Sequence, residues 1–285
     1  MLDPPNVCSE CGYDFPSSCD RCPHCARPGI FPNVRAAEQP WEQEALERRY
    51  TTAVSEAARR GAESTLRAFE LKLAGSKAVI ARNIDELMRL ATSDREIYAT
   101  YYDLVAAGVR IPAGDRWDVL RVATEQSLFP GYKERIRFAA LTLDGEGLAN
   151  YGICSLVLRD SMIAHRASVF EGNPVMWMIR RKELFEGLGS VEPGFRTAWA
   201  NRARLAIAKL GGRLEPDTPR DSFPRLLLSQ GATLPDDDFV EVHVYESLTV
   251  RTLERVKIGP LESQLRMALC EYLRERLGRL GVEVS

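Results

Sequence analysis

The chain has 285 residues, of which 45% are hydrophobic and 27% are charged, and these fractions are typical of a globular protein. Its formal net charge of -2 argues against a strong electrostatic grip on nucleic acid by the chain as a whole. No apolar run approaches the ~20 residues that a helix needs to cross a bilayer, so we expect a cytoplasmic protein without a membrane partner.

Two Cys-x-x-Cys pairs near the N-terminus give the least ambiguous chemical signal of the sequence. Cys8 and Cys11 form the first pair, and Cys22 and Cys25 form the second. Two such pairs separated by a short loop can close a tetrahedral thiolate site around a structural Zn²⁺. A disulfide knot is the alternative, but the sequence has no signal peptide, which favours bound zinc. Cys19 is either a spare thiol or an alternative ligand.

The composition divides the chain into three regions. Residues 1–32 form a zinc-ribbon-like module that is too short for a core of its own, so its fold depends on the ion. Residues 33–74 carry apolar side chains at three- and four-residue steps, which predicts one long helix or a helical hairpin hinged near Gly61. Residues 75–285 mix short strand and helix patterns without a βαβ repeat, which predicts an α+β domain with a C-terminal helix.

Strand and helix patterns alternate irregularly within the third region. We predict strands at residues 77–82, 137–143, 153–158, 167–170 and 239–245, a helix that begins at 83–87, and helices at 195–210 and 261–280. The last strand alternates most clearly, because Val240, Val242 and Val244 face one way and Glu241 and His243 face the other. The valine side predicts a core. From periodicity alone, the other side is a half-exposed surface with a solvated Glu and His.

Basic side chains gather in residues 180–209, around the predicted helix at 195–210. They are Arg180, Arg181, Lys182, Arg196, Arg202, Arg204 and Lys209. A solvated helix face is the ordinary interpretation of such a cluster, and a path for nucleic acid is the sharper alternative.

Short motifs across residues 75–260 resemble the mono-ADP-ribosyltransferase fold, a family that includes bacterial toxins and phage-defence effectors. They are the strand ending at Arg82, Tyr98-Ala-Thr-Tyr-Tyr102, Gly114-Asp-Arg-Trp117, Arg137-Phe-Ala-Ala-Leu141, Tyr151-Gly-Ile-Cys-Ser-Leu156 and Glu241-Val-His243. The resemblance implies a split β-sheet core, NAD⁺ as substrate, a macromolecular acceptor (protein, DNA or RNA) and, for a toxin, a cognate antitoxin. The chain departs from well-known members because Phe239, and not Glu or Gln, stands two residues before Glu241. Arginine is therefore not implied as the modified residue.

The resemblance also implies roles for individual residues. Glu241 is the predicted catalytic residue, because a carboxylate stabilises the oxocarbenium-like ribose that forms when the nicotinamide bond breaks. Arg82 stands at the family position for an arginine that holds the pyrophosphate or a ribose, since its planar fork bonds two oxygens. Tyr101 is the preferred ring to stack on nicotinamide, with Thr100 as a polar neighbour. Arg82 and the neighbouring tyrosines fit ordinary structural roles equally well.

Two functions of other classes also fit the sequence. One is a zinc-dependent nucleic-acid-binding regulator without catalysis, in which the zinc module binds and the α+β domain only assembles. The other is a nuclease that holds Mg²⁺ with acidic side chains. Its candidate ligands are Asp236, Asp237, Asp238, Glu241 and His243.

Overall fold

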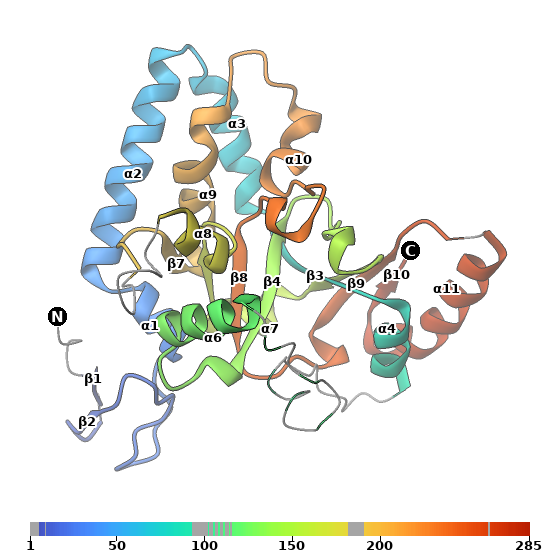
Figure 1. The fold of residues 1–285 in the computed structure, drawn as a ribbon, viewed down its shortest axis with the longest axis horizontal. Helices are drawn as coiled ribbons and strands as arrows, with labels where there is room; N and C mark the ends of the chain where they lie inside the picture. Colours follow the sequence, from blue (N-terminus) through green and yellow to red (C-terminus); the bar gives the residue numbers. More distant parts are fainter. Residues whose placement is uncertain are drawn as a thin grey trace.

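The computed structural model describes residues 6–8, 10–92, 116–181, 191–261 and 263–285, and the single residues 102, 105, 108, 111 and 114. A two-stranded N-terminal ribbon precedes an eight-stranded sheet that has helices on both faces (Figure 1). The α+β class predicted from the sequence is confirmed. No helix among the described residues is both long enough and apolar enough to span a membrane.

The eight strands of the large sheet are hydrogen-bonded in the order β10-β9-β5-β3-β4-β8-β6-β7. Every neighbouring pair is antiparallel except β10 and β9, which are parallel. The strands of the ribbon and the sheet are β1 (Asn6–Val7), β2 (Asp14–Phe15), β3 (Lys77–Arg82), β4 (Ile136–Thr142), β5 (Cys154–Leu158), β6 (Ala167–Phe170), β7 (Arg196–Ala198), β8 (Glu241–Tyr245), β9 (Leu253–Ile258) and β10 (Glu283–Val284).

The α-helices connect these strands and cover them. They are α1 (Pro32–Ala37), α2 (Pro40–Arg59), α3 (Glu63–Ala74), α4 (Ile84–Thr92), α6 (Arg116–Leu128), α7 (Asp160–Ile163), α8 (Pro174–Arg180), α9 (Arg202–Leu210), α10 (Phe223–Leu227) and α11 (Ser263–Leu277). A single 3₁₀ turn, η2 (Ala149–Tyr151), precedes β5.

Most predicted elements are confirmed within a residue or two. Residues 33–74 contain a helical hairpin, because α2 and α3 are separated by a turn in which Gly61 has a φ of 75°. The continuous helix predicted over residues 195–210 is wrong, since its first turn is the edge strand β7, which pairs with β6. Cross-strand hydrogen bonding to an open sheet edge overrides local helical periodicity there. The strands β9 and β10 and the helix α6 were not predicted.

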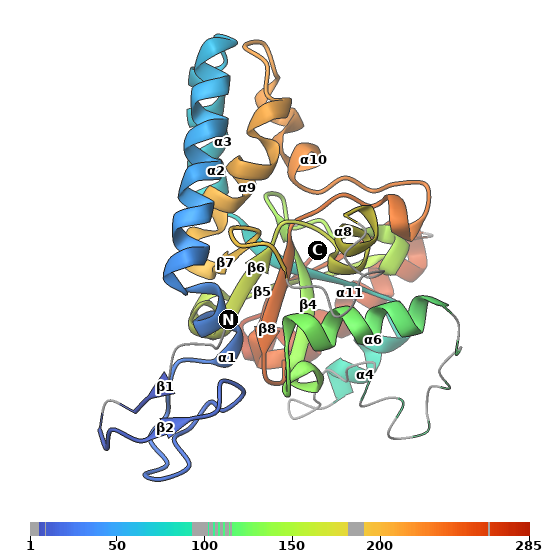
Figure 2. The same cartoon turned by 60° about the vertical axis from the view of Figure 1, so that its left-hand side comes forward.

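The larger hydrophobic core lies on one face of the sheet. Val242 and Val244 of β8, and Val240 directly before that strand, are fully buried in it, as the alternation over residues 239–245 predicts. Apolar side chains of α3, α9, α10 and α11 belong to the same cluster, and so do Leu46 and Ala53 of α2. Figures 1 and 2 show α2, α3, α9 and α10 rising together from one end of the sheet. The hairpin of residues 33–74 is thus part of the main core.

The opposite face of the sheet is also covered, which corrects the expectation of a solvated Glu241 side. Two smaller clusters lie there: one contains Phe170 and Tyr245 together with the end of α6 and the side chains of α8, and the other contains Val79, Ala140 and Phe239. Figure 2 shows α6 in front of β4 and β8. A strand that is buried on both faces leaves little room for a solvated carboxylate, so Glu241 and His243 require partners inside the protein.

The strand arrangement departs from the split β-sheet that the family resemblance implies. The described strands of the α+β domain form one continuous sheet, in which each strand from β10 to β7 is bonded to the next. The sheet contains both parallel and antiparallel pairs, and it is therefore mixed. The architecture supports the α+β class and leaves the ADP-ribosyltransferase fold as a proposal.

Candidate active site and metal site

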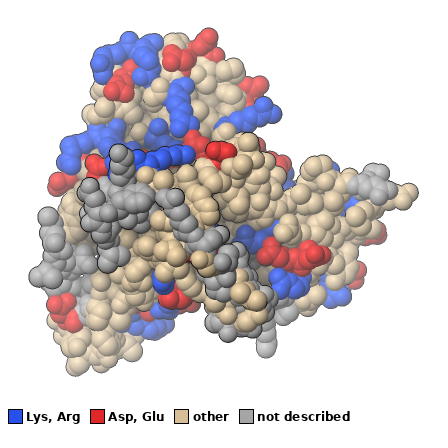
Figure 3. Space-filling model, in the orientation of Figure 1, with Lys and Arg blue, Asp and Glu red and all other residues tan. Residues whose placement is uncertain are grey.

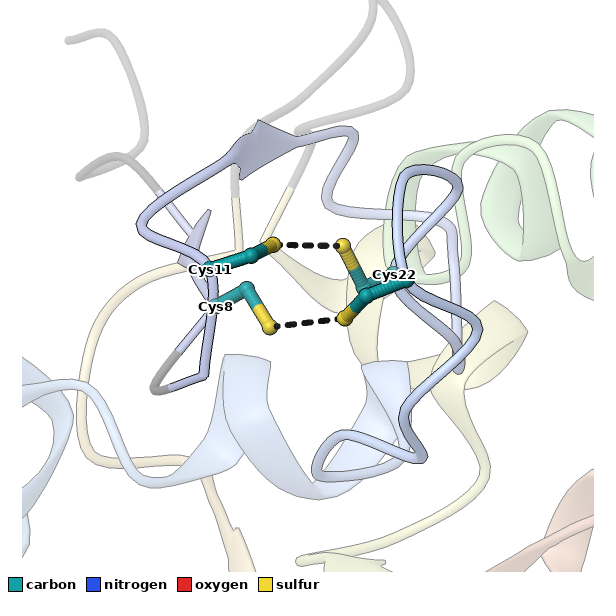
Figure 4. A group of neighbouring side chains, drawn as sticks. Cys8, Cys11 and Cys22 are labelled. Atoms are coloured by element: carbon teal, nitrogen blue, oxygen red, sulfur yellow. Dashed lines mark hydrogen bonds between the residues drawn. The ribbon is translucent and has the colours of Figure 1, made fainter.

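Four cysteines of the N-terminal ribbon bring their sulfur atoms together (Figure 4). The Sγ atoms of Cys8, Cys11, Cys22 and Cys25 all lie within 4.8 Å of one another. The Sγ of Cys8 is 3.5 Å from that of Cys25, and the Sγ of Cys11 is 3.6 Å from that of Cys22. Tetrahedral thiolates at ~2.3 Å from a Zn²⁺ ion lie about 3.8 Å from one another. This four-cysteine cluster therefore has the size that a single metal ion requires.

Both Cys-x-x-Cys pairs are built on the same backbone turn. The N–H of Gly12 donates to the carbonyl of Cys8 at 2.9 Å, and the N–H of Ala26 donates to that of Cys22 at 2.8 Å. Gly12 and Ala26 both have a positive φ, of 70° and 58°. In the first turn, the N–H of Cys11 points at the sulfur of Cys8 and lowers the pKa of that thiol. This contact therefore favours the thiolate of Cys8, which is the form that binds a metal. Burial and hydrogen bonds with neighbouring thiols raise the pKa of Cys11 and Cys25, although backbone N–H groups oppose that shift.

Cys19 lies outside the four-cysteine cluster in the part of the chain that the structure describes. Its loop is held by Arg35 of α1, whose guanidinium donates to the carbonyls of Ser17 and Cys19 at 2.5 Å and 3.0 Å. Asp20 in the same loop pairs with Arg135 at 3.3 Å. The sequence left the role of Cys19 open, and the structure places it in the contact between the ribbon and the α+β domain.

Asn33 connects the segment after the ribbon to the central strands. Its buried amide nitrogen donates to the carbonyl oxygens of Arg166 and His243, at 3.1 Å and 3.0 Å, and to the hydroxyl of Ser168 at 3.2 Å. Phe31 packs against the ring of Tyr245, with 5.2 Å between ring centroids. The segment that follows the ribbon is therefore joined by short contacts to β8, the strand that carries Glu241.

Glu241 and His243 form a buried polar pair on the sheet face beneath α6. They are 8% and 2% exposed, and the Nε2 of His243 lies 2.8 Å from the Oε1 of Glu241. The rings of Phe129 and Phe138 meet the His243 ring edge-on, with centroid distances of 4.8 Å and 5.5 Å. The imidazole is thus held by aromatic packing, and it fixes one carboxylate oxygen of Glu241.

The pair lies where the two apolar clusters of this face meet. Glu241 is paired across the strands with Ala140 on one side and with Phe170 on the other, and these residues belong to different clusters. A carboxylate in such surroundings is shielded from water, so its interaction with a developing positive charge is stronger than on an open surface.

A second carboxylate, Glu125 of α6, faces the same side of the sheet. Phe129, the residue directly after α6, donates its backbone N–H to the carbonyl of Glu125 and contacts the ring of His243. Glu125 is 8% exposed, and its Oε2 accepts a hydrogen bond of 2.6 Å from the hydroxyl of Tyr102. Burial raises the pKa of the Glu125 carboxyl to about 7, and the negative charge of Glu241 adds to this shift. We call Tyr102, Glu125, Glu241 and His243 the carboxylate site.

Tyr151 lies beside the carboxylate site at the end of η2. Partial burial and the negative charges of Glu241 and Asp237 raise its pKa to about 12, while its ring remains partly open to solvent at 38% exposure. Gly152, which has a φ of 140°, lets this turn close on β3, since a Cβ there would lie 2.1 Å from the carbonyl carbon of Arg82. A partly exposed tyrosine therefore lies beside the carboxylate site.

A cation also lies near these groups. Arg121, four residues before Glu125 on α6, lowers the pKa of Glu125 and of Tyr151. Residues four apart on a helix share a face, so Arg121 and Glu125 are directed to the same side of α6. The carboxylate site thus has an arginine in electrostatic range.

Arg82 is not brought to Glu241. The register aligns Val79 of β3 with Ala140 of β4, and Ala140 with Glu241, so that Arg82 is three residues further along and two strands away. This separation corresponds to about 14 Å between Cα atoms. Arg82 is paired across the strands with Cys154, whose side chain lies in the main core. The side chain of Arg82 therefore starts from the main-core face of the sheet, and that of Glu241 starts from the opposite face. Arg82 instead pairs with Glu86, the Nε and Oε2 atoms being 3.7 Å apart.

Two further candidates, Thr100 and Tyr101, lie outside the described residues. Their neighbour Tyr102 is described and belongs to the carboxylate site through Glu125. Sequence reasoning missed Glu125 and Arg121 because it assigned no helix to residues 116–128. Their four-residue spacing is the signal that could have indicated them.

The acidic residues before β8 do not gather around a metal. Asp236 accepts from the hydroxyl of Thr233 at 2.6 Å, and Asp237 accepts from the amide of Asn150 at 2.9 Å. Asp238 pairs with two cations, Lys209 and Arg213, at 2.5 Å each. Among the described residues, only the four-cysteine cluster has the geometry of a metal site. Each aspartate thus has a local structural role, which argues against the nuclease hypothesis.

The basic cluster of residues 180–209 is largely neutralised. Five of its described members have acidic partners: Arg181 pairs with Glu192, Arg196 with Glu42, Arg202 with Asp160, Arg204 with Glu47 and Lys209 with Asp238. Figure 3 shows acidic side chains interspersed among the basic ones over this part of the molecule. A cluster paired in this way does not form a continuous positive path for nucleic acid.

No family model matches the chain, and no curated protein matches its sequence.

Proposed function

We propose that the α+β domain of residues 75–285 is an NAD⁺-dependent mono-ADP-ribosyltransferase and that the four-cysteine cluster holds a structural Zn²⁺. The observation that carries the enzymatic proposal is the buried pair of Glu241 and His243, which lies beneath the second carboxylate of Glu125. Carboxylates flanking one position are the groups that glycosidic bond cleavage uses. The resemblance of the chain to the ADP-ribosyltransferase family names NAD⁺ as the molecule that carries this bond.

Glu241 is the group proposed to stabilise the transition state. The C1′–N bond of NAD⁺ breaks toward nicotinamide, which leaves as a neutral molecule, and positive charge develops on the ribose. A carboxylate in a water-poor site stabilises this charge, and removal of one such group costs about 10²–10³ in rate. The hydrogen bond from His243 orients Glu241 at 2.8 Å, so the carboxylate is in place before NAD⁺ binds.

Other residues of the site supply binding functions in this proposal. Arg121 replaces Arg82 as the arginine proposed to hold the pyrophosphate, because it is in range of Glu125 and Tyr151. Tyr151, partly exposed beside Glu241, is the ring proposed to stack on the nicotinamide or a ribose. The acceptor is a protein, DNA or RNA, and a toxin or phage-defence role with a cognate antitoxin follows from the family resemblance.

The zinc proposal rests on the chemistry of the donor set. Four cysteine sulfur atoms that all lie within 4.8 Å of one another match the preference of Zn²⁺ for soft ligands in a closed structural site. A bound ion would hold the ribbon in shape, because Cys8 and Cys22 form its small buried cluster and, among the described residues, Cys19 is the partly buried side chain packed against them.

The alternative, a zinc-dependent nucleic-acid-binding regulator, has less support. The paired charges of residues 180–209 leave little basic surface on the α+β domain to assist such binding. The ribbon itself offers few cations: between residues 6 and 31 only Arg21 and Arg27 are basic, against the acidic Glu10, Asp14 and Asp20.

Incubation of the purified chain with NAD⁺ labelled in the adenylate, in the presence of cell extract, tests the enzymatic proposal. We expect release of nicotinamide and label on a macromolecule, and digestion with protease or nuclease then identifies the class of acceptor. The Glu241→Gln protein is the negative control. A gel shift of nucleic acid without label and without loss of NAD⁺ would instead favour the regulator.

A further inference from the structure

The carboxylate site contains a charged group that the stabilisation of the ribose cation does not use. Glu241 and its partner His243 suffice for that role, yet α6 buries a second carboxylate, Glu125, against the same face of the sheet. The strand β8 itself offers no second carboxylate there, since Phe239, two residues before Glu241, is apolar and buried. Burial of a carboxylate is costly unless surrounding groups hold it, so its presence calls for a physical explanation.

The position of Glu125 relative to Glu241 follows from three contacts. Phe129 directly follows the last residue of α6 and lies one helical turn after Glu125, and its ring centroid is 4.8 Å from that of His243. His243 in turn lies 2.8 Å from Glu241. The charge of Glu241 acts on Glu125 directly, since it contributes to the raised pKa of the Glu125 carboxyl. The two carboxylates therefore lie on the same side of the sheet and within electrostatic range of each other.

We propose that Glu125 is a second catalytic carboxylate, which takes the proton from a hydroxyl group of the acceptor as that oxygen attacks C1′ of the ribose. This inference rests on the proposed ADP-ribosyl transfer and names the acceptor chemistry, a hydroxyl. In the step, the C1′–N bond breaks with its electron pair going to nicotinamide, and a bond from the acceptor oxygen to C1′ forms. The proton that the hydroxyl loses passes to the carboxylate of Glu125, so charge and atoms balance.

The surroundings of Glu125 suit a base that works near neutral pH. Burial raises the pKa of its carboxyl to about 7, and Glu241 raises it further, while Tyr102, Arg121 and Lys133 oppose the shift. A base whose pKa is near the working pH combines a useful fraction of deprotonated side chain with a strong tendency to accept a proton. The hydroxyl of Tyr102 donates to Oε2 at 2.6 Å and so fixes the orientation of the carboxylate. Oε1 is then the oxygen proposed to accept the proton.

The test uses the full chain with NAD⁺ and methanol as a simple hydroxyl acceptor, and it measures methyl ADP-ribose and nicotinamide by chromatography. We expect Glu125→Gln to lower methanol transfer by about 10²–10⁴-fold, the usual contribution of a positioned base. NAD⁺ affinity, measured by calorimetry, should change little. The rate of the unmodified protein should rise with pH through an inflection near 7, and Glu125→Gln should remove this inflection. Glu63→Gln is the matched control, because Glu63 also lies on a helix four residues from an arginine.

Two further measurements separate a proton-transfer role from a structural one. Azide carries no proton to remove, so it should restore nicotinamide release to Glu125→Ala with ADP-ribosyl azide as product, and it should not rescue Glu241→Ala. Tyr102→Phe removes a hydrogen bond that lowers the pKa of Glu125, so it should move the pH inflection upward.

The outcomes distinguish this inference from the proposed function. Full methanol transfer by Glu125→Gln, an unchanged inflection, or a failure of azide to rescue Glu125→Ala would overturn the role of Glu125 and leave ADP-ribosyl transfer standing. Loss of NAD⁺ affinity in Glu125→Gln would also overturn it, since the residue would then be a binding group. An unmodified protein that releases no nicotinamide would overturn the proposed function and this role with it.

Discussion

The four-cysteine cluster and the carboxylate site are assembled in opposite ways. The cysteines all come from one short segment, Cys8 to Cys25, and repeated backbone turns aim them at one point. The carboxylate site takes Tyr102 and Glu125 from one side of the sheet and Glu241 and His243 from a strand more than a hundred residues later. The first site is specified by local spacing, and the second exists only when α6 closes over β8.

The two sites also differ in what holds them. The ribbon has almost no apolar core, so its order depends on the metal. The carboxylate site is surrounded by apolar clusters that bury two acidic groups. Burial of a carboxylate costs free energy, which the rest of the folded domain offsets. Removal of the metal should therefore disturb one region only, whereas a change of charge at the second site should alter both activity and stability.

Loss of a cysteine ligand should have the largest effect. Cys22→Ser should reduce the zinc content from about one ion per chain to almost none and unfold the ribbon, since structural zinc binding is worth about 10–16 kcal/mol in small zinc modules. Cys19→Ser is the matched control and should keep its zinc, because Cys19 lies outside the cluster. Metal analysis and hydrogen exchange of residues 6–31 give the measurement. Absence of zinc from freshly prepared, reduced protein would contradict the metal site.

Glu241→Gln should have the next largest effect, and it should affect the carboxylate site without affecting the four-cysteine cluster. Removal of the negative charge should slow nicotinamide release from NAD⁺ by about 10²–10³-fold. Because Glu241 is buried, we also expect a stability cost of about 1 kcal/mol for the altered hydrogen bond to His243. Steady-state kinetics and thermal unfolding measure the two effects. A fully active Glu241→Gln protein would exclude this carboxylate from the reaction.

Glu125→Gln should change the pH dependence of stability. The carboxyl has its pKa raised from 4.5 to about 7 in the folded state, so below pH 4.5 it is protonated in both states and has no effect. Between pH 4.5 and 7 the unfolded state loses its proton first, and the free energy of unfolding falls as the pH rises. A pKa shift of this size lowers the free energy of unfolding by about 3 kcal/mol above pH 7.

Denaturant unfolding across this pH range provides the measurement for Glu125→Gln. The variant should be more stable than the unmodified protein above pH 7, and the difference should shrink toward pH 4.5. A difference that is constant with pH would show that Glu125 is not buried as a titrating acid.

Ala26→Gly should have the smallest effect and tests the symmetry of the two cysteine turns. Ala26 has a φ of 58°, a conformation that costs a residue with a Cβ roughly 1 kcal/mol, whereas Gly12 occupies the equivalent position in the first turn without that cost. Ala26→Gly should therefore raise the apparent zinc affinity about fivefold, and Gly12→Ala should lower it to a similar extent. Competition with a chromophoric chelator measures both. Equal affinities for all three proteins would contradict the left-handed turn.

Much of the fold could be predicted because the pattern of apolar residues reflects burial directly. The alternation over residues 239–245 predicts a core face through Val240, Val242 and Val244, and all three are buried. The same alternation gives no information on what covers the other face. Glu241 and His243 were expected to be solvated on periodicity alone, and α6 and the aromatic rings of Phe129 and Phe138 bury them instead.

The sequence by itself determined the parts that depend on neighbours along the chain: the two cysteine pairs, the helical hairpin, and the strands with clear alternation. Only the tertiary structure decided which charged residues meet. It separated Arg82 from Glu241 by placing their side chains on opposite faces of the sheet. It also brought the hydroxyl of Tyr102 into a hydrogen bond with Glu125, 23 residues later in the chain. The physical reason is that ligand spacing and periodicity are local properties, whereas register and helix packing are set by the burial of the whole sheet.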